Sequence, residues 1–145
     1  MNNLKSILLA EDNPNDVELT LEALLENKIA NPIVVLNDGV EVMEYLRRNA
    51  TDQPLSNGNP CLILLDIKMP RMDGIETLQA IRADQAFRAI PVVVLTSSKE
   101  EKDIVNAYNL GVNAYVLKPV LFQKFIEAVK QIGSFWAVLN ELPPE

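Results

Sequence analysis

The chain has 145 residues, which predicts one domain with a core large enough to fold without disulfides. Its 20 acidic residues against 13 basic ones give a net charge of -7, which argues against a nucleic-acid-binding domain, because such a domain presents a basic face. The single cysteine suits a reducing compartment, no signal peptide is recognisable, and no apolar run approaches the ~20 residues that span a bilayer, so we expect a cytoplasmic protein without membrane contact.

The first third of the chain alternates apolar runs with helical patterns. Ser6–Ala10 and Ile33–Leu36 are typical of short buried strands. Between them Asn13 is a suitable N-cap and Pro14 a suitable first residue for a helix that ends near Asn27. The apolar stripe expected on this helix consists of Val17, Leu21, Leu24 and Leu25.

A polar turn at residues 37–39 precedes the second expected helix. The apolar stripe of that helix consists of Val42, Met43, Tyr45 and Leu46. The segment from Asn49 to Pro60 is rich in proline, asparagine, serine and glycine, which predicts the longest loop of the chain.

The middle of the chain predicts a third strand, a tight loop and a short helix. Cys61–Leu65 is the strand, with the cysteine expected as a small core residue. The loop at 67–74 carries Met69, Pro70 and Gly74, to which we assign a structural role. Ile75, Leu78 and Ile81 mark the helix that follows.

The last third predicts two more strands, each followed by a helix. The hydroxyls of residues 96–98 are expected to cap the first of these helices, and Gly111 to end it. Arg82, Lys99 and Lys102 are expected to be solvated helix charges. The expected elements are Ile90–Leu95, a helix from Lys99 to about Leu110, Ala114–Leu117, and a helix from near Leu121 to about Leu139. Five alternating strands and helices predict an α/β fold, a parallel sheet covered by helices on both faces.

Chemically useful side chains follow four of the expected strands. Glu11 and Asp12 follow the first strand, Asp66 the third, Thr96 the fourth and Lys118 the fifth. Because the carboxyl ends of parallel strands meet at one edge of the sheet, these side chains are expected to converge there. Three carboxylates, in a chain without histidine, favour a hard cation, and Mg²⁺ fits best because it also accepts a phosphate oxygen.

The order of these motifs resembles the receiver domain of two-component response regulators over nearly the whole chain. The motifs are the acid pair, the Asp-x-x-Met-Pro-x-x-Asp-Gly run at 66–74, a threonine that ends a strand, and Lys-Pro at 118–119. The resemblance implies a single receiver domain at residues 1–145. Its fold would be flavodoxin-like and doubly wound, with five helices and a five-stranded parallel sheet in the order 2-1-3-4-5.

The resemblance also assigns roles to the residues at the sheet edge. Asp66 would be the phosphoacceptor, and Thr96 and Lys118 would bind the phosphoryl oxygens. Tyr115 is either an aromatic switch that responds to Thr96 or a statically packed side chain, and both interpretations stay open. The residues expected to hold Mg²⁺ are Glu11, Asp12, Asp66 and the backbone carbonyl of Lys68.

The favoured function is a stand-alone response regulator that accepts a phosphoryl group from a sensor histidine kinase and relays the signal by a change of its surface. It would be a signalling protein that catalyses only its own phosphorylation and dephosphorylation. The alternative is a Mg²⁺-dependent phosphohydrolase with an aspartyl nucleophile, which would usually have an acid two residues after the nucleophile, where this chain has Lys68. That lysine could pair with the acids of the site or point to solvent.

A narrower resemblance concerns the start at 11–16, the long loop before the third strand, and the extended C-terminal helix and tail at 132–145. These features are similar to the small single-domain regulators of cyanobacterial phytochrome-type histidine kinases. The tail carries a second apolar cluster, which predicts a homodimer unless the cluster folds back on its own domain. This cluster consists of Phe135, Trp136, Val138 and Leu139.

Overall fold

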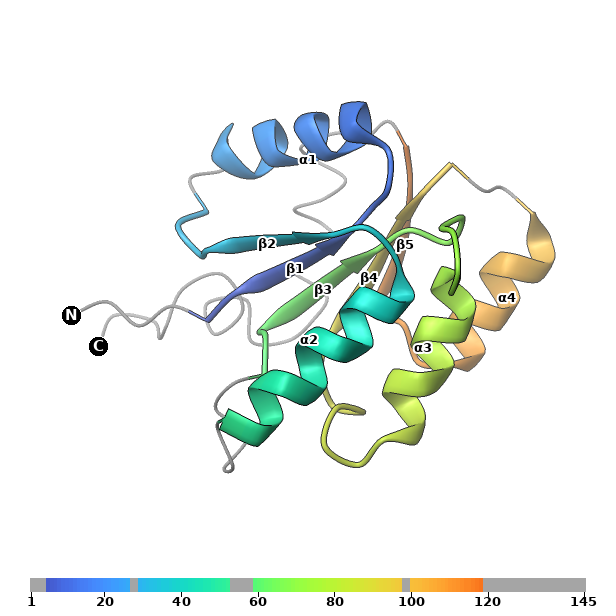
Figure 1. The fold of residues 1–145 in the computed structure, drawn as a ribbon. Helices are drawn as coiled ribbons and strands as arrows, with labels where there is room; N and C mark the ends of the chain where they lie inside the picture. Colours follow the sequence, from blue (N-terminus) through green and yellow to red (C-terminus); the bar gives the residue numbers. More distant parts are fainter. Residues whose placement is uncertain (1–4, 27–28, 53–58, 98–99, 119–145) are drawn as a thin grey trace, which may run out of the picture.

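The computed structural model describes residues 5–26, 29–52, 59–97 and 100–118. Within these ranges strands and helices alternate along the chain (Figure 1). The order is β1 (Ile7–Ala10), α1 (Pro14–Glu26), β2 (Ile33–Leu36), α2 (Gly39–Asp52), β3 (Leu62–Leu65), α3 (Gly74–Ala83), β4 (Val92–Thr96), α4 (Glu101–Asn109) and β5 (Ala114–Leu117). The expected helix from near Leu121 and the tail at 132–145 lie outside the described residues.

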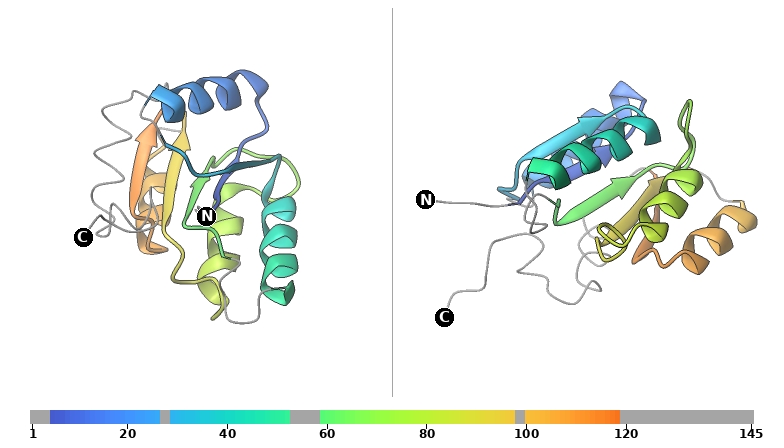
Figure 2. Two further views of the ribbon diagram at one scale, coloured as in Figure 1. Left: turned by 90° about the vertical axis from the view of Figure 1, so that its left-hand side faces the viewer. Right: turned by 60° about the horizontal axis from the view of Figure 1, so that its bottom comes forward.

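The five strands form one parallel sheet in the order β2-β1-β3-β4-β5, as expected. Alternate residues of the central strands face opposite sides of the sheet. Leu8, Ile63 and Val94 pack in one core cluster with residues of α2, α3 and α4, whereas Leu9 and Leu64 pack in a second cluster with residues of α1. The sheet therefore has α1 on one face and the other three described helices on the opposite face (Figures 1 and 2).

Several local predictions are confirmed. Asn13 caps α1, because its Oδ1 accepts hydrogen bonds from the backbone N–H groups of Asn15 and Asp16 at 2.9 and 3.1 Å. Gly111 follows the last residues of α4 with a φ of 77°, the left-handed conformation that favours glycine. Gly74 also has a structural role, because a Cβ there would lie 2.2 Å from the carbonyl oxygen of Asp66.

Other local predictions are wrong. The second helix continues to Asp52, so residues 49–52 belong to α2 and not to the expected loop. Thr96 is the last residue of β4, and the N-cap of α4 is Glu100, which makes no side-chain cap bond. Leu25 is 73% exposed and contributes little to the core under α1. No helix in the described part of the chain is long and apolar enough to cross a membrane.

Candidate functional site

Strand register places the expected site residues in line at the carboxyl edge of the sheet. Ala10 pairs with Leu65, so the next residues, Glu11 and Asp66, leave neighbouring strands at the same level. The backbone N–H of Asp66 also donates to the Ala10 carbonyl at 3.1 Å. At the ends of the paired strands β4 and β5, the Lys118 N–H donates to the Thr96 carbonyl at 2.9 Å. The backbone therefore brings both acids, the threonine and the lysine to one edge.

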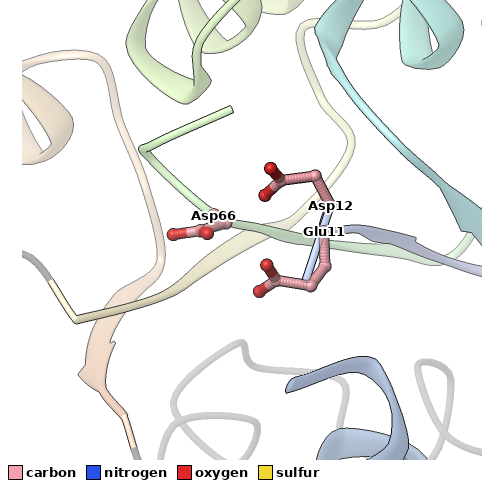
Figure 3. A group of neighbouring side chains, drawn as sticks. All are labelled: Glu11, Asp12 and Asp66. Carbon is pink, nitrogen blue, oxygen red and sulfur yellow. The ribbon is translucent and has the colours of Figure 1, made fainter. Parts of the chain in front are cut away.

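Glu11, Asp12 and Asp66 form a compact group of carboxylates at this edge (Figure 3). Each offers one oxygen, and these oxygens lie within 4.8 Å of one another. Glu11 and Asp66 are buried, whereas Asp12 is exposed to solvent. Three hard oxygen donors at this spacing fit a divalent cation such as Mg²⁺, which binds a few carboxylates and keeps several waters. The donors therefore match the expected metal site.

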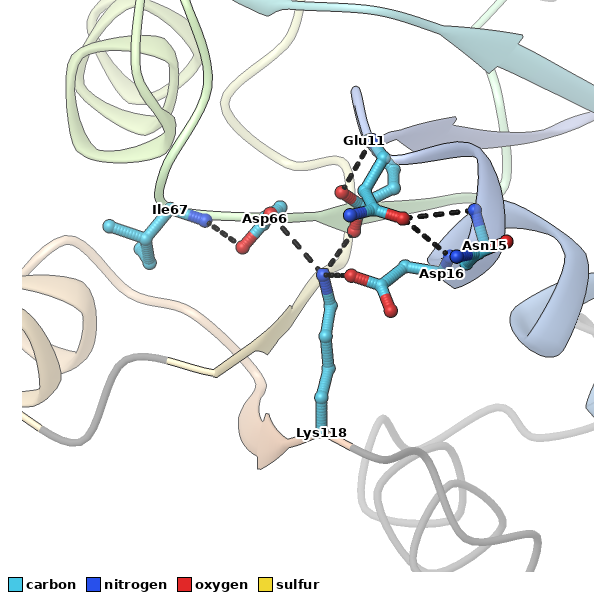
Figure 4. A network of polar contacts seen from close by, with 7 residues as sticks. Glu11, Asn15, Asp16, Asp66, Ile67 and Lys118 are labelled. Atoms are coloured by element: carbon cyan, nitrogen blue, oxygen red, sulfur yellow. Dashed lines mark hydrogen bonds and ion pairs between the residues drawn. The ribbon is translucent and has the colours of Figure 1, made fainter.

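Lys118 places its ammonium group among three carboxylates (Figure 4). Its Nζ donates to Glu11 Oε1, to Asp16 Oδ2 at 2.8 Å and to Asp66 Oδ2 at 3.3 Å. The Lys118 side chain is 10% exposed, so these contacts are largely shielded from water. A lysine ammonium has three donors, and each has an acceptor here.

Backbone donors fix the second oxygen of two of these carboxylates. Asp66 Oδ1 accepts from the Ile67 N–H at 2.8 Å, and Glu11 Oε2 accepts from the Asn13 N–H at 3.1 Å. Each of these two carboxylates therefore has one oxygen bonded to the backbone N–H of a residue that follows it, and the other oxygen bonded to the Lys118 ammonium. For Asp66 this leaves Oδ2 as the oxygen that faces the Lys118 ammonium, at 3.3 Å.

Burial and the excess of acids change the proton affinities in the site. Burial, helped by the nearby charge of Asp66, raises the pKa of Glu11 to about 7, although the hydrogen bond from Lys118 opposes the shift. Burial alone would lower the pKa of Lys118, but its hydrogen bonds to Asp16 and Glu11 outweigh that effect and raise it. Lys118 therefore remains charged at neutral pH.

The remaining expected site residues surround this centre. Thr96 is fully buried at the end of β4, and Tyr115 lies partly buried on β5 against the core cluster under α2, α3 and α4. The Lys68 side chain is 61% exposed, and its Nζ lies 3.9 Å from Glu100 and 3.7 Å from Asp103. Its ammonium group therefore faces the start of α4 and not the carboxylates of the site.

Two contacts at the site were missed by sequence reasoning. Asp16 is the acidic residue of the first turn of α1, and no sequence pattern pairs a residue of this helix with Lys118. Arg71 has a φ of 61° and donates from Nε and Nη2 to the two carboxylate oxygens of Asp38, at 2.7 and 3.1 Å. This pair ties the loop after β3 to the start of α2. No sequence pattern marks a left-handed arginine.

Comparisons with known proteins point to one family. A model of the response regulator receiver domain matches residues 7–130. Response regulator Rcp1 from Synechocystis sp. is 37% identical over 139 residues, which cover 96% of this chain and 93% of Rcp1. Its Mn²⁺-bound crystal structure has a TM-score of 0.73 at 36% identity and covers 97% of this chain and 99% of that one.

Two further solved structures are similar over almost their full length. The bacteriophytochrome response regulator AtBRR is 49% identical with a TM-score of 0.81, covering 95% of this chain and 99% of its own. The phosphorylated cyanobacterial phytochrome response regulator RcpA is 39% identical with a TM-score of 0.74, covering 98% of this chain and 100% of its own.

Proposed function

Because the chain belongs to the response regulator receiver domain family, we propose that it accepts a phosphoryl group on Asp66 and passes on a signal in that state. The observation that carries the proposal is the position of Asp66. It stands at the carboxyl end of the central strand, with Oδ1 held by the Ile67 N–H and Oδ2 facing Lys118. The backbone thus orients one oxygen, and the proposal makes the other oxygen the nucleophile.

The phosphoryl step requires a carboxylate nucleophile and donors for the equatorial oxygens. Asp66 Oδ2 would attack the phosphorus of a phosphohistidine on a partner protein. A P–O bond forms, the P–N bond breaks, and the imidazole leaves with the electron pair and takes up a proton. The Lys118 ammonium, which lies beside Oδ2, would donate to one of the new phosphoryl oxygens. The Thr96 hydroxyl would donate to another.

We assign a Mg²⁺ site to Glu11, Asp12, Asp66 and the backbone carbonyl of Lys68. When bound, this cation would neutralise negative charge that develops during transfer. The close spacing of the three carboxylates supports the assignment, as does the Mn²⁺-bound form of the related Rcp1. Glu11 must be ionised to serve as a ligand, and above its pKa of about 7 it is.

The donor would be a sensor histidine kinase of the phytochrome type. This chain has no histidine, so the phosphohistidine must belong to a partner. The related AtBRR and RcpA are both response regulators of phytochromes, which supports the narrower assignment. Such a kinase presents its phosphohistidine inside the cell, and we therefore place this protein in the cytoplasm.

The contacts of Lys68 argue against the alternative, a phosphohydrolase with an aspartyl nucleophile. That chemistry would usually use a general acid two residues after Asp66, where Lys68 stands. The Lys68 ammonium faces Glu100 and Asp103. The described part of the chain therefore offers no acid in the required position.

Intact-mass measurement after incubation with acetyl phosphate and Mg²⁺ tests the phosphoacceptor. We expect one phosphoryl adduct on the wild type and none on Asp66→Asn. Asp73→Asn is the matched control, because Asp73 caps α3 in the same loop and asparagine caps equally well. A full yield of adduct on Asp66→Asn would show that another residue accepts the phosphoryl group.

A further inference from the structure

We propose that Asp16, in the first turn of α1, is a positioning residue that keeps Lys118 at the phosphorylation site while a divalent cation occupies the carboxylates of Glu11 and Asp66. The inference rests on the proposed function and adds a residue to it. It starts from the three hydrogen bonds of the Lys118 ammonium (Figure 4).

The three acceptors of Lys118 differ in one respect. Glu11 and Asp66 also belong to the group of carboxylates whose oxygens lie within 4.8 Å of one another and could hold a metal ion. Asp16 does not belong to that group. Within the described part of the chain, Asp16 is thus the one partner of Lys118 that a cation at the site would not share.

A cation and the Lys118 ammonium compete for the same oxygens. A divalent ion that binds Glu11 and Asp66 draws their lone pairs away from Nζ and repels its positive charge. Lys118 is 10% exposed, and an ammonium left there without acceptors would carry a large desolvation cost. It would then turn toward water, away from the oxygen that takes the phosphoryl group. The Asp16 carboxylate prevents this, because it continues to accept from Nζ.

Asp16 is held in place for this role by the start of α1. Its backbone N–H donates to Asn13 Oδ1 at 3.1 Å, and the Asn13 N–H donates to Glu11 Oε2 at 3.1 Å. The segment from Glu11 to Asp16 therefore carries two of the cation ligands, Glu11 and Asp12, and also the separate anchor of Lys118. The Asp16 side chain is 32% exposed, so its removal leaves no buried cavity.

The test compares Asp16→Asn with Glu18→Gln. Glu18 is an exposed acid on the same helix, so its replacement removes the same charge without touching Lys118. At saturating Mg²⁺ we expect acetyl phosphate to label Asp16→Asn about tenfold more slowly than the wild type, because asparagine keeps an acceptor oxygen but removes the negative charge that strengthens this hydrogen bond. Glu18→Gln should react at the wild-type rate.

A double-mutant cycle separates positioning from general stability. In a Lys118→Ala background, Asp16→Asn should cause no further loss of rate, because its action passes through Lys118. A second readout needs no phosphorylation: the ¹⁵N–¹H signal of the Lys118 ammonium. On titration with Mg²⁺ it should stay sharp in the wild type and be lost to exchange with water in Asp16→Asn.

Equal labelling rates for wild type and Asp16→Asn would overturn the proposal, as would a Lys118 signal that responds to Mg²⁺ identically in both. An undiminished effect of Asp16→Asn without Lys118 would also overturn it. If the wild type takes no phosphoryl group at all, the proposed function fails. The Mg²⁺ titration of the ammonium signal still decides the role of Asp16 in that case.

Discussion

Charge is unbalanced around Lys118. One ammonium faces the carboxylates of Glu11, Asp16 and Asp66, and Asp12 adds a further acid at the rim. The raised pKa of Glu11 is a consequence of its burial and of this excess of negative charge. A bound cation would relieve the repulsion, so the folded state should bind Mg²⁺ more strongly than the unfolded chain does.

We therefore expect Mg²⁺ to raise the melting temperature, and Asp12→Ala to reduce the increase. At a Mg²⁺ concentration of 100 times Kd the stabilisation by mass action is about 2.7 kcal/mol, or several degrees for a domain of this size. Asp12 is exposed, so its loss should hardly change the metal-free protein. Differential scanning fluorimetry with and without Mg²⁺ measures the effect, and Glu18→Ala is the control. Equal shifts in wild type and Asp12→Ala would place the cation elsewhere.

At the residue scale, sequence order predicted which acids meet but not all of their partners. Glu11, Asp12 and Asp66 follow strands, and a parallel sheet brings strand ends together. Asp16 lies in a helix, and its distance from Lys118 depends on how α1 crosses the sheet. The expectation that Arg82 is a solvated charge was wrong, because its contacts also depend on how helices pack. Residue spacing predicts which side of α3 is exposed, but it does not predict that carbonyls after α4 lie within reach of that side.

At the scale of elements, Arg82 joins the ends of two helices and a strand. Its guanidinium donates to the carbonyls of Leu110 and Gly111 after α4, and to those of Arg88 and Ile90 before β4. All four bonds measure 2.9 to 3.0 Å. A cation near these carbonyls also complements the C-terminal dipole of α4. Arg82 therefore stabilises the side of the domain that carries α3 and α4.

Replacing Arg82 should cost stability. Arg82→Ala leaves four carbonyls without their donor, and we expect a loss of about 2 kcal/mol in the free energy of unfolding. Arg82→Lys should recover part of it, because an ammonium can bond some of these oxygens but cannot match the planar fork. Urea denaturation measures both, with the exposed Arg88→Ala as control. A loss no larger than that of Arg88→Ala would contradict the role of this network.

Element ends were predicted less well than element order, and the errors have physical causes. The hydroxyls at 96–98 suggested a helix cap, but Thr96 pairs with Leu117 in the sheet and so extends β4. Asn49 suggested a loop, yet its side-chain nitrogen donates to the Tyr45 carbonyl one turn back in α2. Cap-forming residues can also bond within strands and helices, and tertiary pairing decides which occurs.

The switch from Thr96 to Tyr115 belongs to this scale and stays a prediction. Val94 pairs with Tyr115, and Thr96 follows two residues later on the same face of β4. If phosphorylation draws the Thr96 hydroxyl inward, Tyr115 could follow and shift the surface of α4 and β5. We expect Tyr115→Ala to be phosphorylated normally while losing most of this change, measured as phosphorylation-dependent hydrogen exchange in α4 and β5.

Tyr108→Ala is the control for the switch, because Tyr108 is an exposed tyrosine of α4. It should keep the exchange difference between the two phosphorylation states. An unchanged difference in Tyr115→Ala as well would assign Tyr115 to static packing.

At the scale of the whole molecule, the strand order was predicted from the resemblance and not from the strands themselves. The five strands of the described part have four or five residues and are apolar apart from Thr96, so periodicity does not distinguish a central strand from an edge strand. In the structure, burial distinguishes central strands from edge strands. β1, β3 and β4 are buried throughout, whereas the edge strands β2 and β5 are partly exposed. The assignment of residues 1–145 to one receiver domain stays a prediction, because residues 119–145 lie outside the described part.

The expected homodimer also depends on that segment. The apolar cluster around Phe135 and Trp136 lies outside the described residues, and Leu117 at the edge strand β5 is 40% exposed. Exposed apolar surface of this kind is commonly buried in an interface with a second copy of the chain. We expect sedimentation velocity at tens of micromolar to give a dimer for the wild type, and a monomer for Phe135→Ala with Trp136→Ala. Leu25→Ala, which removes an exposed leucine of α1, should stay dimeric. If the cluster folds back on its own domain, the wild type will be monomeric in both phosphorylation states, and the same substitutions will lower the melting temperature without changing the mass.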